Sequence, residues 1–494
     1  MSVLVSTLAT AYALAMIVLL LYGGNLLVLV VRRARLDRLH AGRAPAPEAP
    51  ALVRPVPHVL IQLPIYNEPP ALVARLLDAC FAMDYPRDRF DVQVLDDSTD
   101  GSSADVERIV QRRQSEGVEV MHVRRTDRTG FKAGALDNGL KLTPAQFVAV
   151  FDADFLPTRG FLRQMLPAFA DKQIGLVQAR WGHLNPDASL LTQIQAYGLD
   201  AHFAMEQYVR HGAGCFMNFN GTAGIWRIAC IDDAGGWHGD TLAEDLDLSY
   251  RAQLKGWRFR YRNDVSVPAE LPDTLAALRT QQFRWTKGAA QVAQKLLGRV
   301  VRAPVTRFVK AEAIAQLTAP FMYPFLLVAI LLHVPLLTLR AQGYGPSDAY
   351  FAALGIGLIG FAGFALAHLF TQRDLYPDWL RRLWILPLFM AGSMGMALRN
   401  TGALWSTLRG RVTPFVRTPK SGSAKGAAGL RIGLEVAFTL YCLLGLGVLI
   451  AQGDWAAVPF QLLFTMGFGL IAWMGYGTAP ALLASPAHLV ESTP

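Results

Sequence analysis

The sequence predicts an α/β domain with a mainly parallel sheet, inserted between transmembrane α-helices. One observation is composition, because hydrophobic residues make up 52% of the chain and charged residues only 17%. Such an apolar chain is unusual for a soluble enzyme. The other is that strand-like and helix-like segments alternate from about residue 57 to 272. This alternation is typical of a mainly parallel sheet.

Long stretches without a charged side chain predict about five membrane spans. The first covers residues 2–31, and four more are expected near 313–338, 350–370, 434–452 and 457–480. A run of about 20 apolar residues crosses a bilayer as a helix. The first stretch is too long for a signal-peptide core, and no small-residue cleavage site follows it. We therefore expect it to be retained.

Two further segments are expected to lie along the membrane surface. Residues 273–300 mix apolar positions with Arg, Gln and Lys, as interfacial helices do. Residues 383–398 are apolar, but this stretch is short for a span. If it is interfacial, the basic loop 409–431 lies on the same side as the α/β domain. Arginines cluster after residue 31, which places that side in the cytoplasm of an integral, multi-pass inner-membrane protein.

The predicted organisation has five parts: a transmembrane helix at 1–32, a basic and Ala/Pro-rich linker at 33–56, a cytoplasmic domain at 57–272, interfacial helices at 273–310 and a transmembrane region at 311–494. The net charge of +9 comes from basic residues beside the apolar stretches, so no nucleic-acid partner is expected. Four cysteines show no metal or disulfide spacing and fit a reducing compartment.

The strands of the α/β domain are predicted from buried runs that end at polar turns. They lie at His58–Pro64, Asp91–Leu95, Val118–Val123 and Phe147–Phe151, and a helix is expected at Pro70–Phe81. In a parallel sheet the chemistry lies at the carboxyl ends of the strands. The first two acidic clusters of the chain directly follow two of these strands.

Those two clusters are candidate functional residues. Asp97 follows the second strand, and Asp152 and Asp154 follow the fourth. Two carboxylates at a strand end can hold a divalent hard cation, which would bridge a diphosphate. Solvated loop carboxylates are the alternative, but two such clusters at successive strand ends favour a functional site.

Two more clusters complete the set. Glu244 and Asp245 could deprotonate an acceptor hydroxyl, or they could be the acidic first turn of a helix. In the stretch Gln281–Trp285, Arg284 could stabilise a leaving diphosphate and Trp285 could stack on a sugar ring. An Arg/Trp anchor at the membrane interface is the alternative.

In this order, the four clusters resemble the D, DxD, (T)ED and QxxRW motifs of the processive family 2 glycosyltransferases, which include cellulose, chitin and hyaluronan synthases. Stretches such as QLPIYNEPP (62–70), GFKAGAL (130–136) and FNGTAGIWR (219–227) are most similar to the cellulose-synthase-like (gluco)mannan and glucan synthases. The resemblance covers residues 57–300 densely. It implies a GT-A type, mixed and mainly parallel sheet. It also implies inverting transfer of a hexose from UDP-glucose or GDP-mannose to a growing β-linked polysaccharide.

The resemblance also assigns roles in donor binding. The cofactor would be a divalent metal ion, Mg²⁺ or Mn²⁺, held by Asp154 and Asp152. The side chains expected to bind the nucleotide-sugar are Tyr66, Glu68, Asp97, Lys132, Asp152 and Arg284.

The acceptor side and the catalytic groups follow in the same way. Asp245, beside Glu244, would be the general base, and Gln281 and Arg284 would flank the diphosphate. The acceptor sugar would contact Trp285 and the segment Phe219, Asn220, Gly221 and Thr222. Finally, a cytoplasmic loop at 409–431 resembles a gating loop that closes over the nucleotide, through Phe415, Thr418 and Lys420.

The chain departs from the family pattern in several places. Ala243 replaces the threonine of the TED motif, and Arg417 stands where the gating pattern has valine. A basic cytoplasmic loop is the alternative to a gate. Only one span precedes the domain and no obvious regulatory domain ends the chain. We therefore do not expect the chain itself to carry dependence on a cyclic-dinucleotide activator.

Two other functions are considered. One is transfer of a single sugar to a lipid acceptor such as diacylglycerol, ceramide or a polyprenyl phosphate. The other is a membrane transporter with an inactive cytoplasmic domain, which the intact Asp97, Asp152, Asp154 and Asp245 argue against. The complete QxxRW motif and the gate-like loop favour a polymer over a lipid product. Choice among hexoses depends on contacts with individual hydroxyls, and the sequence predicts no oligomeric state.

Overall fold

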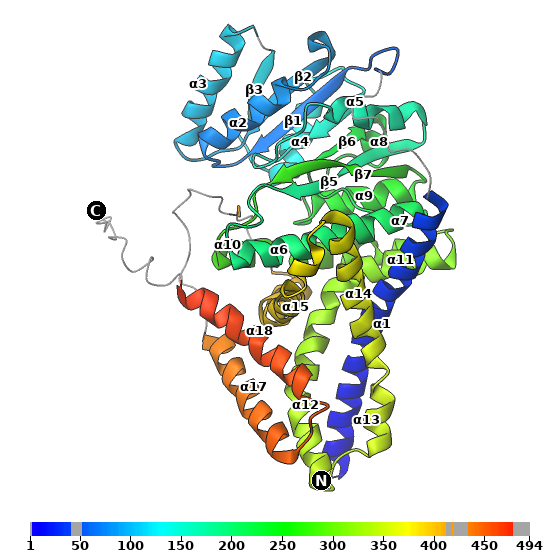
Figure 1. Ribbon diagram of the computed structural model, residues 1–494. Coiled ribbons are helices and arrows are strands. Elements are labelled where there is room, and N and C mark those ends of the chain that lie inside the picture. Colours follow the sequence, from blue (N-terminus) through cyan, green and yellow to red (C-terminus); the bar gives the residue numbers. More distant parts are fainter. Residues whose placement is uncertain (1, 41–51, 118, 412–416, 419–432, 478–494) are drawn as a thin grey trace, which may run out of the picture.

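The computed structural model describes residues 2–40, 52–117, 119–411, 417–418 and 433–477. A sheet with flanking helices forms the upper half of Figure 1, and long helices form the lower half. The chain enters the sheet domain from the first long helix and returns from it to the others. The predicted insertion of an α/β domain between long apolar helices is therefore confirmed.

Seven strands in the described part of the chain form one sheet, in the order β3-β2-β1-β4-β6-β5-β7. Neighbouring strands are parallel, except that β6 runs antiparallel to β4 and β5. This confirms a mixed, mainly parallel sheet, and each of the four predicted strands is present. The strands are β1 (Val59–Ile65), β2 (Phe90–Asp96), β3 (Val120–Arg124), β4 (Phe147–Val150), β5 (Ile174–His183), β6 (Gly224–Arg227) and β7 (Arg258–Ala269).

Helices cover both faces of the sheet, and its central strands are therefore buried on both sides. Val73, Leu76 and Leu77 of α2 pack against one face of β1, while Leu136 of α4 packs with Leu60 on the other face. The helix predicted at Pro70–Phe81 has those bounds. The elements around the sheet are α2 (Pro70–Phe81), η1 (Arg87–Arg89), α3 (Ser102–Ser115), α4 (Phe131–Leu140), α5 (Phe161–Met165), η2 (Leu166–Ala170), α8 (Ile228–Asp233) and α9 (Glu244–Leu254).

Five helical segments in the described residues are long and apolar enough to cross a membrane, as the sequence predicts. One difference is at the first of them, which continues to His40 instead of giving way to a linker at residue 33. Its arginines therefore extend the same helix beyond the apolar part. The elements of these segments are α1 (Ser2–His40), α11 (Arg307–Thr318), η4 (Ala319–Phe321), α12 (Met322–Ala341), α13 (Asp348–Leu354), α14 (Gly357–Leu375), α17 (Gly433–Gln452) and α18 (Val458–Gly477).

Another group of helices lies between the sheet domain and the long helices. In Figure 1, α6 and α10 run across the long helices, and α15 is seen end-on. This placement is consistent with the interfacial positions predicted for 273–300 and 383–398. The group comprises α6 (Leu190–Ala201), the π-helical turn η3 (His202–Gln207), α7 (Tyr208–Gly212), α10 (Leu275–Arg302), η5 (Trp379–Arg382), α15 (Ile385–Gly395) and α16 (Ala397–Leu408).

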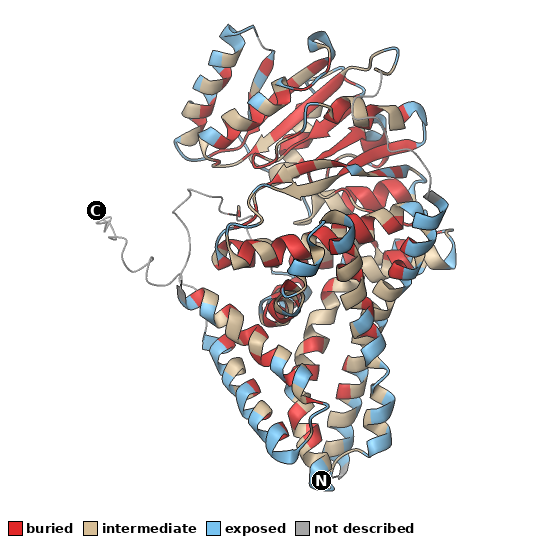
Figure 2. Cartoon of the chain, in the orientation of Figure 1, coloured by how far each residue is buried: buried red, intermediate tan, exposed pale blue. Residues whose placement is uncertain are grey.

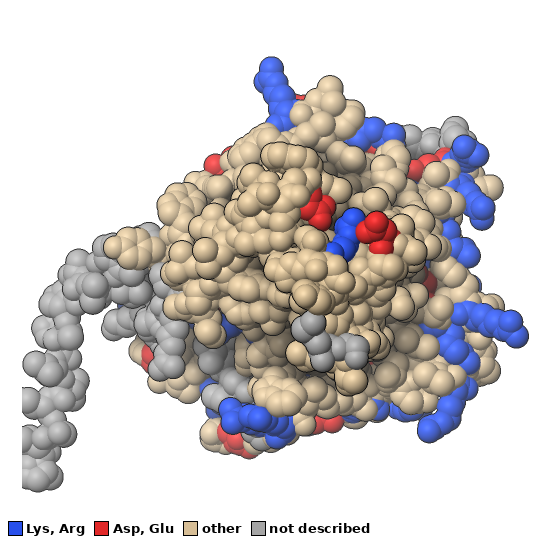
Figure 3. Space-filling view, turned by 90° about the horizontal axis from the view of Figure 1, so that it is seen from below, with Lys and Arg blue, Asp and Glu red and all other residues tan. Residues whose placement is uncertain are grey.

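The surface of the lower half is apolar. Figure 2 shows exposed residues along the outer faces of the long helices, and large apolar side chains such as Leu21, Leu444 and Trp473 are among them. Seen from below, the centre of this face carries a small group of charges within a largely uncharged area, and the other charges in view lie around its rim (Figure 3). Apolar outer faces of this kind are what helices in contact with lipid require.

Candidate active site

A pocket lies where the carboxyl ends of the central strands face α9 and α10. Strands β1, β2 and β4 end at this edge because they are parallel neighbours. The segment before β6 reaches the same edge because β6 is antiparallel. The pocket brings together most of the predicted residues, namely Tyr66, Glu68, Asp97, Lys132, Asp152, Asp154, Asn220, Gly221, Glu244, Asp245, Gln281, Arg284, Trp285 and Thr418.

Lys132 lies at the centre of the acidic part of this pocket. Its Nζ is 2.5 Å from Asp152 Oδ1 and donates a hydrogen bond to the Gly221 carbonyl oxygen at 2.9 Å. Burial disfavours the ammonium, but Asp152, Glu244 and Asp245 together raise the pKa of Lys132 above its usual value. Lys132 is therefore a firmly held cation at the meeting point of three motifs.

Asp245 lies in the first turn of α9, where its Oδ1 accepts a hydrogen bond from the backbone N–H of Leu246 at 2.7 Å. Burial and the neighbouring Glu244 carboxylate raise the pKa of Asp245 to about 7, although Lys132 acts in the opposite direction. Asp245 thus belongs to the acidic first turn of a helix and also lines the pocket, so its functional role stays a prediction. A carboxyl group with a pKa near neutrality is suited to accept a proton in a reaction.

The other end of the pocket is formed by the turns after β1 and β2. The Arg128 guanidinium lies 3.6 Å from the centre of the Tyr66 ring. Arg125 donates two hydrogen bonds to Asp97, at 2.9 and 2.5 Å. Sequence reasoning missed both arginines, although they lie in the basic loop RRTDRTG between β3 and α4. Arg125 also donates to backbone carbonyls of that loop at 2.9 Å, so it joins the loop to Asp97.

The predicted acceptor segment is only partly in the pocket. Asn220 and Gly221 line it. Phe219 and Thr222 are fully buried and are not wall residues, which corrects the prediction that their side chains contact an acceptor. Phe219 packs edge-on against Trp226, and Thr222 Oγ1 accepts a hydrogen bond from the Asp152 backbone N–H at 3.0 Å. These two buried side chains therefore pack around the pocket without forming part of its surface.

The QxxRW motif lies on α10. Gln281, Arg284 and Trp285 share one face of the helix because their spacing is three and four residues, and all three line the pocket. The interpretation of Trp285 as a membrane anchor alone is therefore not needed.

The predicted gating loop is described only at residues 417–418. Thr418 is buried and lines the pocket. Arg417 forms an ion pair with Glu68 at 2.6 Å, so the residue that departs from the family pattern contacts a predicted donor-binding residue. Phe415 and Lys420 lie outside the described residues.

The donor set of the pocket fits a divalent cation. Among the described residues, seven carboxylates line the pocket against four basic side chains. An anionic diphosphate entering such a pocket needs a compensating positive charge, and carboxylate oxygens are the ligands that Mg²⁺ and Mn²⁺ prefer. Asp152 and Asp154 are the pair at one strand end. His238, Asp240 and Asp247 form a second cluster.

That second cluster already holds a cation of its own. Lys295 Nζ lies 3.1 Å from His238 Nδ1, 2.8 Å from Asp240 Oδ1 and 2.9 Å from Asp247 Oδ1. The ammonium thus occupies the position that a metal ion would take. Lys132 Nζ likewise contacts Asp152 Oδ1, so Asp152 and Asp154 are preferred for their shared position at a strand end and in the pocket, and not because a cation is lacking there.

The comparisons with known proteins agree with this geometry. Residues 57–288 match the family described as "Glycosyltransferase like family 2". Glucomannan 4-beta-mannosyltransferase 9 of Arabidopsis thaliana is 37% identical over 398 residues, which are 77% of this chain and 70% of that protein. Glucomannan 4-beta-mannosyltransferase 2 of the same plant is 45% identical over 259 residues, 51% of this chain. The match with it spans about half of its length, 48%.

A solved structure shares the fold. It is a mannosyltransferase from Pyrobaculum calidifontis in complex with GDP-Man and Mn²⁺, with a TM-score of 0.54 and 22% identity, covering 81% of this chain and all of that one. The sequence matches and the four motifs gathered in one pocket identify the family of the chain. The chain belongs to the family 2 glycosyltransferases.

Proposed function

We propose that the protein transfers mannose from GDP-mannose, or glucose from UDP-glucose, to a growing β-linked polysaccharide at the cytoplasmic face of a membrane. One observation carries this proposal: the four motifs that are separate in the sequence line a single pocket, in a chain whose described residues include five helical segments long enough to span a bilayer. The names of the relatives and the GDP-Man complex favour mannose as the sugar and a polysaccharide over a lipid as the acceptor.

The proposed reaction is a single displacement. The acceptor hydroxyl attacks the anomeric carbon, the bond from that carbon to the diphosphate breaks, and an α-linked donor gives a β-linked product. Asp245 takes the proton of the hydroxyl, and Arg284 and Lys132 balance charge on the departing diphosphate. Asp152 and Asp154 would hold a divalent metal ion, Mg²⁺ or Mn²⁺, whose contribution when bound is further neutralisation of the diphosphate.

The direct test uses membranes that contain the full chain. Radiolabelled GDP-mannose, UDP-glucose and UDP-N-acetylglucosamine are supplied separately, and the products are digested with linkage-specific hydrolases. We expect a polymer that β-mannanase or β-glucanase releases as oligosaccharides. A product that extracts into organic solvent as a lipid bearing one sugar would refute the proposal in favour of the lipid-acceptor alternative.

Gly221 offers a test of the acceptor wall. Its φ is 81°, and a Cβ there would lie 3.0 Å from Asp245 Oδ2 and 3.5 Å from Lys132 Nζ. Gly221→Ala should therefore displace the Asp245 carboxylate and lower kcat by about 10²-fold, the cost of misplacing a reacting group by about 1 Å. Gly214→Ala is the matched control, because its φ is +67° but no atom crowds the added methyl. Equal activity of the two variants would contradict this account.

The metal site can be tested by binding as well as by activity. Asp154→Asn should weaken Mn²⁺ binding, measured by electron paramagnetic resonance of the purified protein, and should reduce transfer to the level seen with excess chelator. Asp240→Asn is the control, since its cluster is filled by Lys295. If only Asp240→Asn lost Mn²⁺ binding, the second cluster would be the metal site instead.

A further inference from the structure

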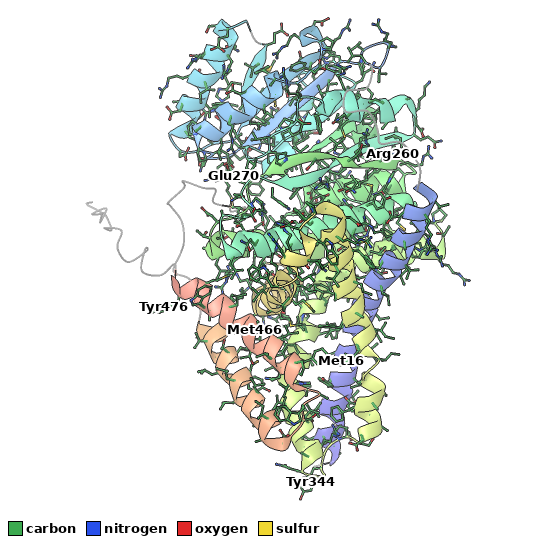
Figure 4. All side chains as sticks on the ribbon, viewed as in Figure 1. Met16, Arg260, Glu270, Tyr344, Met466 and Tyr476 are labelled. Atoms are coloured by element: carbon green, nitrogen blue, oxygen red, sulfur yellow. The ribbon has the colours of Figure 1, made fainter. Side chains whose placement is uncertain are left out.

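One side of the pocket carries polar residues that none of the motifs includes. His183, the last residue of β5, lines it together with Leu199 of α6 and Glu270 after β7. Figure 4 shows Glu270 at the edge of the sheet domain that faces the long helices. Asn185 exchanges two hydrogen bonds with the Leu271 backbone, at 2.8 and 3.1 Å, which joins the ends of β5 and β7 into one wall.

The His183 ring is held by a buried carboxylate. Its Nε2 lies 3.0 Å from Asp200 Oδ1, and the two side chains are 5% and 1% exposed. The other oxygen of Asp200 accepts hydrogen bonds from the Tyr376 hydroxyl at 2.8 Å and from Gln372 Nε2 at 3.3 Å. An ionised carboxylate can only accept hydrogen bonds, so the ring must donate to it as the hydroxyl and the amide do.

This arrangement fixes which ring nitrogen can serve a ligand. Because an ionised Asp200 only accepts hydrogen bonds, His183 Nε2 carries a proton, and in the neutral ring Nδ1 then keeps its lone pair. In the described part of the chain no group donates to Nδ1. His183 lines the pocket, and because Asp200 holds Nε2, Nδ1 is the ring nitrogen that remains for a ligand there. The nucleotide-side residues Tyr66 and Asp97 come instead from the ends of β1 and β2.

We propose that His183 is a further acceptor-binding residue, which accepts a hydrogen bond from a hydroxyl of the acceptor saccharide, and that Asp200, Tyr376 and Gln372 position it. A sugar hydroxyl can donate such a bond, whereas the oxygens of an ionised diphosphate only accept. In its neutral form His183 is therefore suited to the saccharide rather than to the leaving group. The inference rests on the proposed function, because it takes the acceptor to be a saccharide.

Two substitutions of His183 separate its proposed contact with the acceptor from its contact with Asp200. His183→Gln can keep the donor to Asp200 but lacks an acceptor at the position of Nδ1. His183→Asn can place an amide oxygen near Nδ1 but is too short to reach Asp200. With purified full-length protein and β-1,4-mannohexaose as acceptor, we expect His183→Gln to raise the acceptor KM about tenfold, as the loss of one hydrogen bond does. Its donor KM, kcat and unfolding midpoint should stay near wild type.

His183→Asn should show the opposite pattern, with a lower unfolding midpoint and an acceptor KM closer to wild type. His58→Gln is the matched control, because His58 faces Asp91 at 3.5 Å at the other end of the sheet. An unchanged acceptor KM in His183→Gln, or a rise in its donor KM instead, would overturn the inference.

A binding measurement keeps this outcome distinct from failure of the proposed function. Mannohexaose binding is measured by thermophoresis without any donor, so it does not depend on turnover. Absence of transfer by the wild-type protein from any nucleotide-sugar would refute the proposed function. Equal mannohexaose affinities for wild type and His183→Gln, or no binding by either protein, would refute the role of His183.

Discussion

Asp245→Asn should lower kcat about 10³-fold while leaving nucleotide binding nearly unchanged. The loss is that of a general base in the transition state, and the amide cannot accept a proton in its place. The change is isosteric, and Oδ1 can still accept the hydrogen bond from the Leu246 N–H. The measurement is initial transfer rate at saturating donor and acceptor, with donor affinity determined separately on the same protein. A variant that turned over donor at the wild-type rate would exclude Asp245 as the base.

The wild-type pH profile gives a second test of the same residue. Since burial and Glu244 raise the pKa of Asp245 to about 7, the base is increasingly protonated below neutrality. We expect kcat to fall as pH drops through about 7, and this acid limb should be missing from the residual activity of Asp245→Asn. Asp264→Asn, at a surface position paired with Arg262, should keep the limb.

The free energy of unfolding should depend on pH in the opposite direction to kcat. A carboxyl whose pKa is raised on folding holds its proton more tightly in the folded state than in the unfolded chain. The wild-type free energy of unfolding therefore decreases as pH rises from about 4 to about 7, by the contribution of this one group. Asp245→Asn removes that contribution, so the variant should gain stability relative to wild type at pH 7 and above. Urea titrations at pH 5 and pH 8 measure the difference.

Much of this site could be predicted because its parts follow strand ends. Asp97 stands directly after β2 and Asp152 two residues after the end of β4, and a parallel sheet brings such positions to one edge. The spacing of Gln281, Arg284 and Trp285 places them on one helix face without any knowledge of packing. For these residues, local sequence and a general rule of topology are sufficient.

The remaining residues depend on contacts that are distant in the sequence. Arg125 pairs with Asp97 only because the β3–α4 loop folds back beside β2, which no local pattern indicates. His183 is held by Asp200, and that carboxylate in turn is held by side chains far along the chain. Hydropathy predicts an end of the first helix at residue 32, but helix formation does not require apolar residues and continues to His40. Phe219 and Thr222 belong to a segment that resembles the family, yet both side chains are buried and neither lines the pocket.

Lys132→Met should lower kcat/KM for the donor by about 10²- to 10³-fold, because it removes a preorganised charge from the site of the leaving diphosphate. Methionine keeps the length and apolar stem of lysine but not its ammonium. Asp152, Glu244 and Asp245 then face one another without the cation that lies 2.5 Å from Asp152. The donor KM should rise, and initial rates at varied donor concentration measure it.

The pH dependence of kcat in Lys132→Met tests whether Lys132 acts on Asp245 through its charge or only maintains the shape of the pocket. In the wild-type protein Lys132 lowers the pKa of Asp245 against the combined effect of burial and Glu244. Without it, that pKa must rise, so the acid limb of kcat should move above pH 7 in Lys132→Met and return toward its original position in Lys132→Arg. Lys141→Met, just beyond the same helix α4 and paired with Asp137 at the surface, should shift neither donor KM nor the limb. A lower rate with an unmoved acid limb would mean that Lys132 supports the shape of the pocket but does not control the charge of its base.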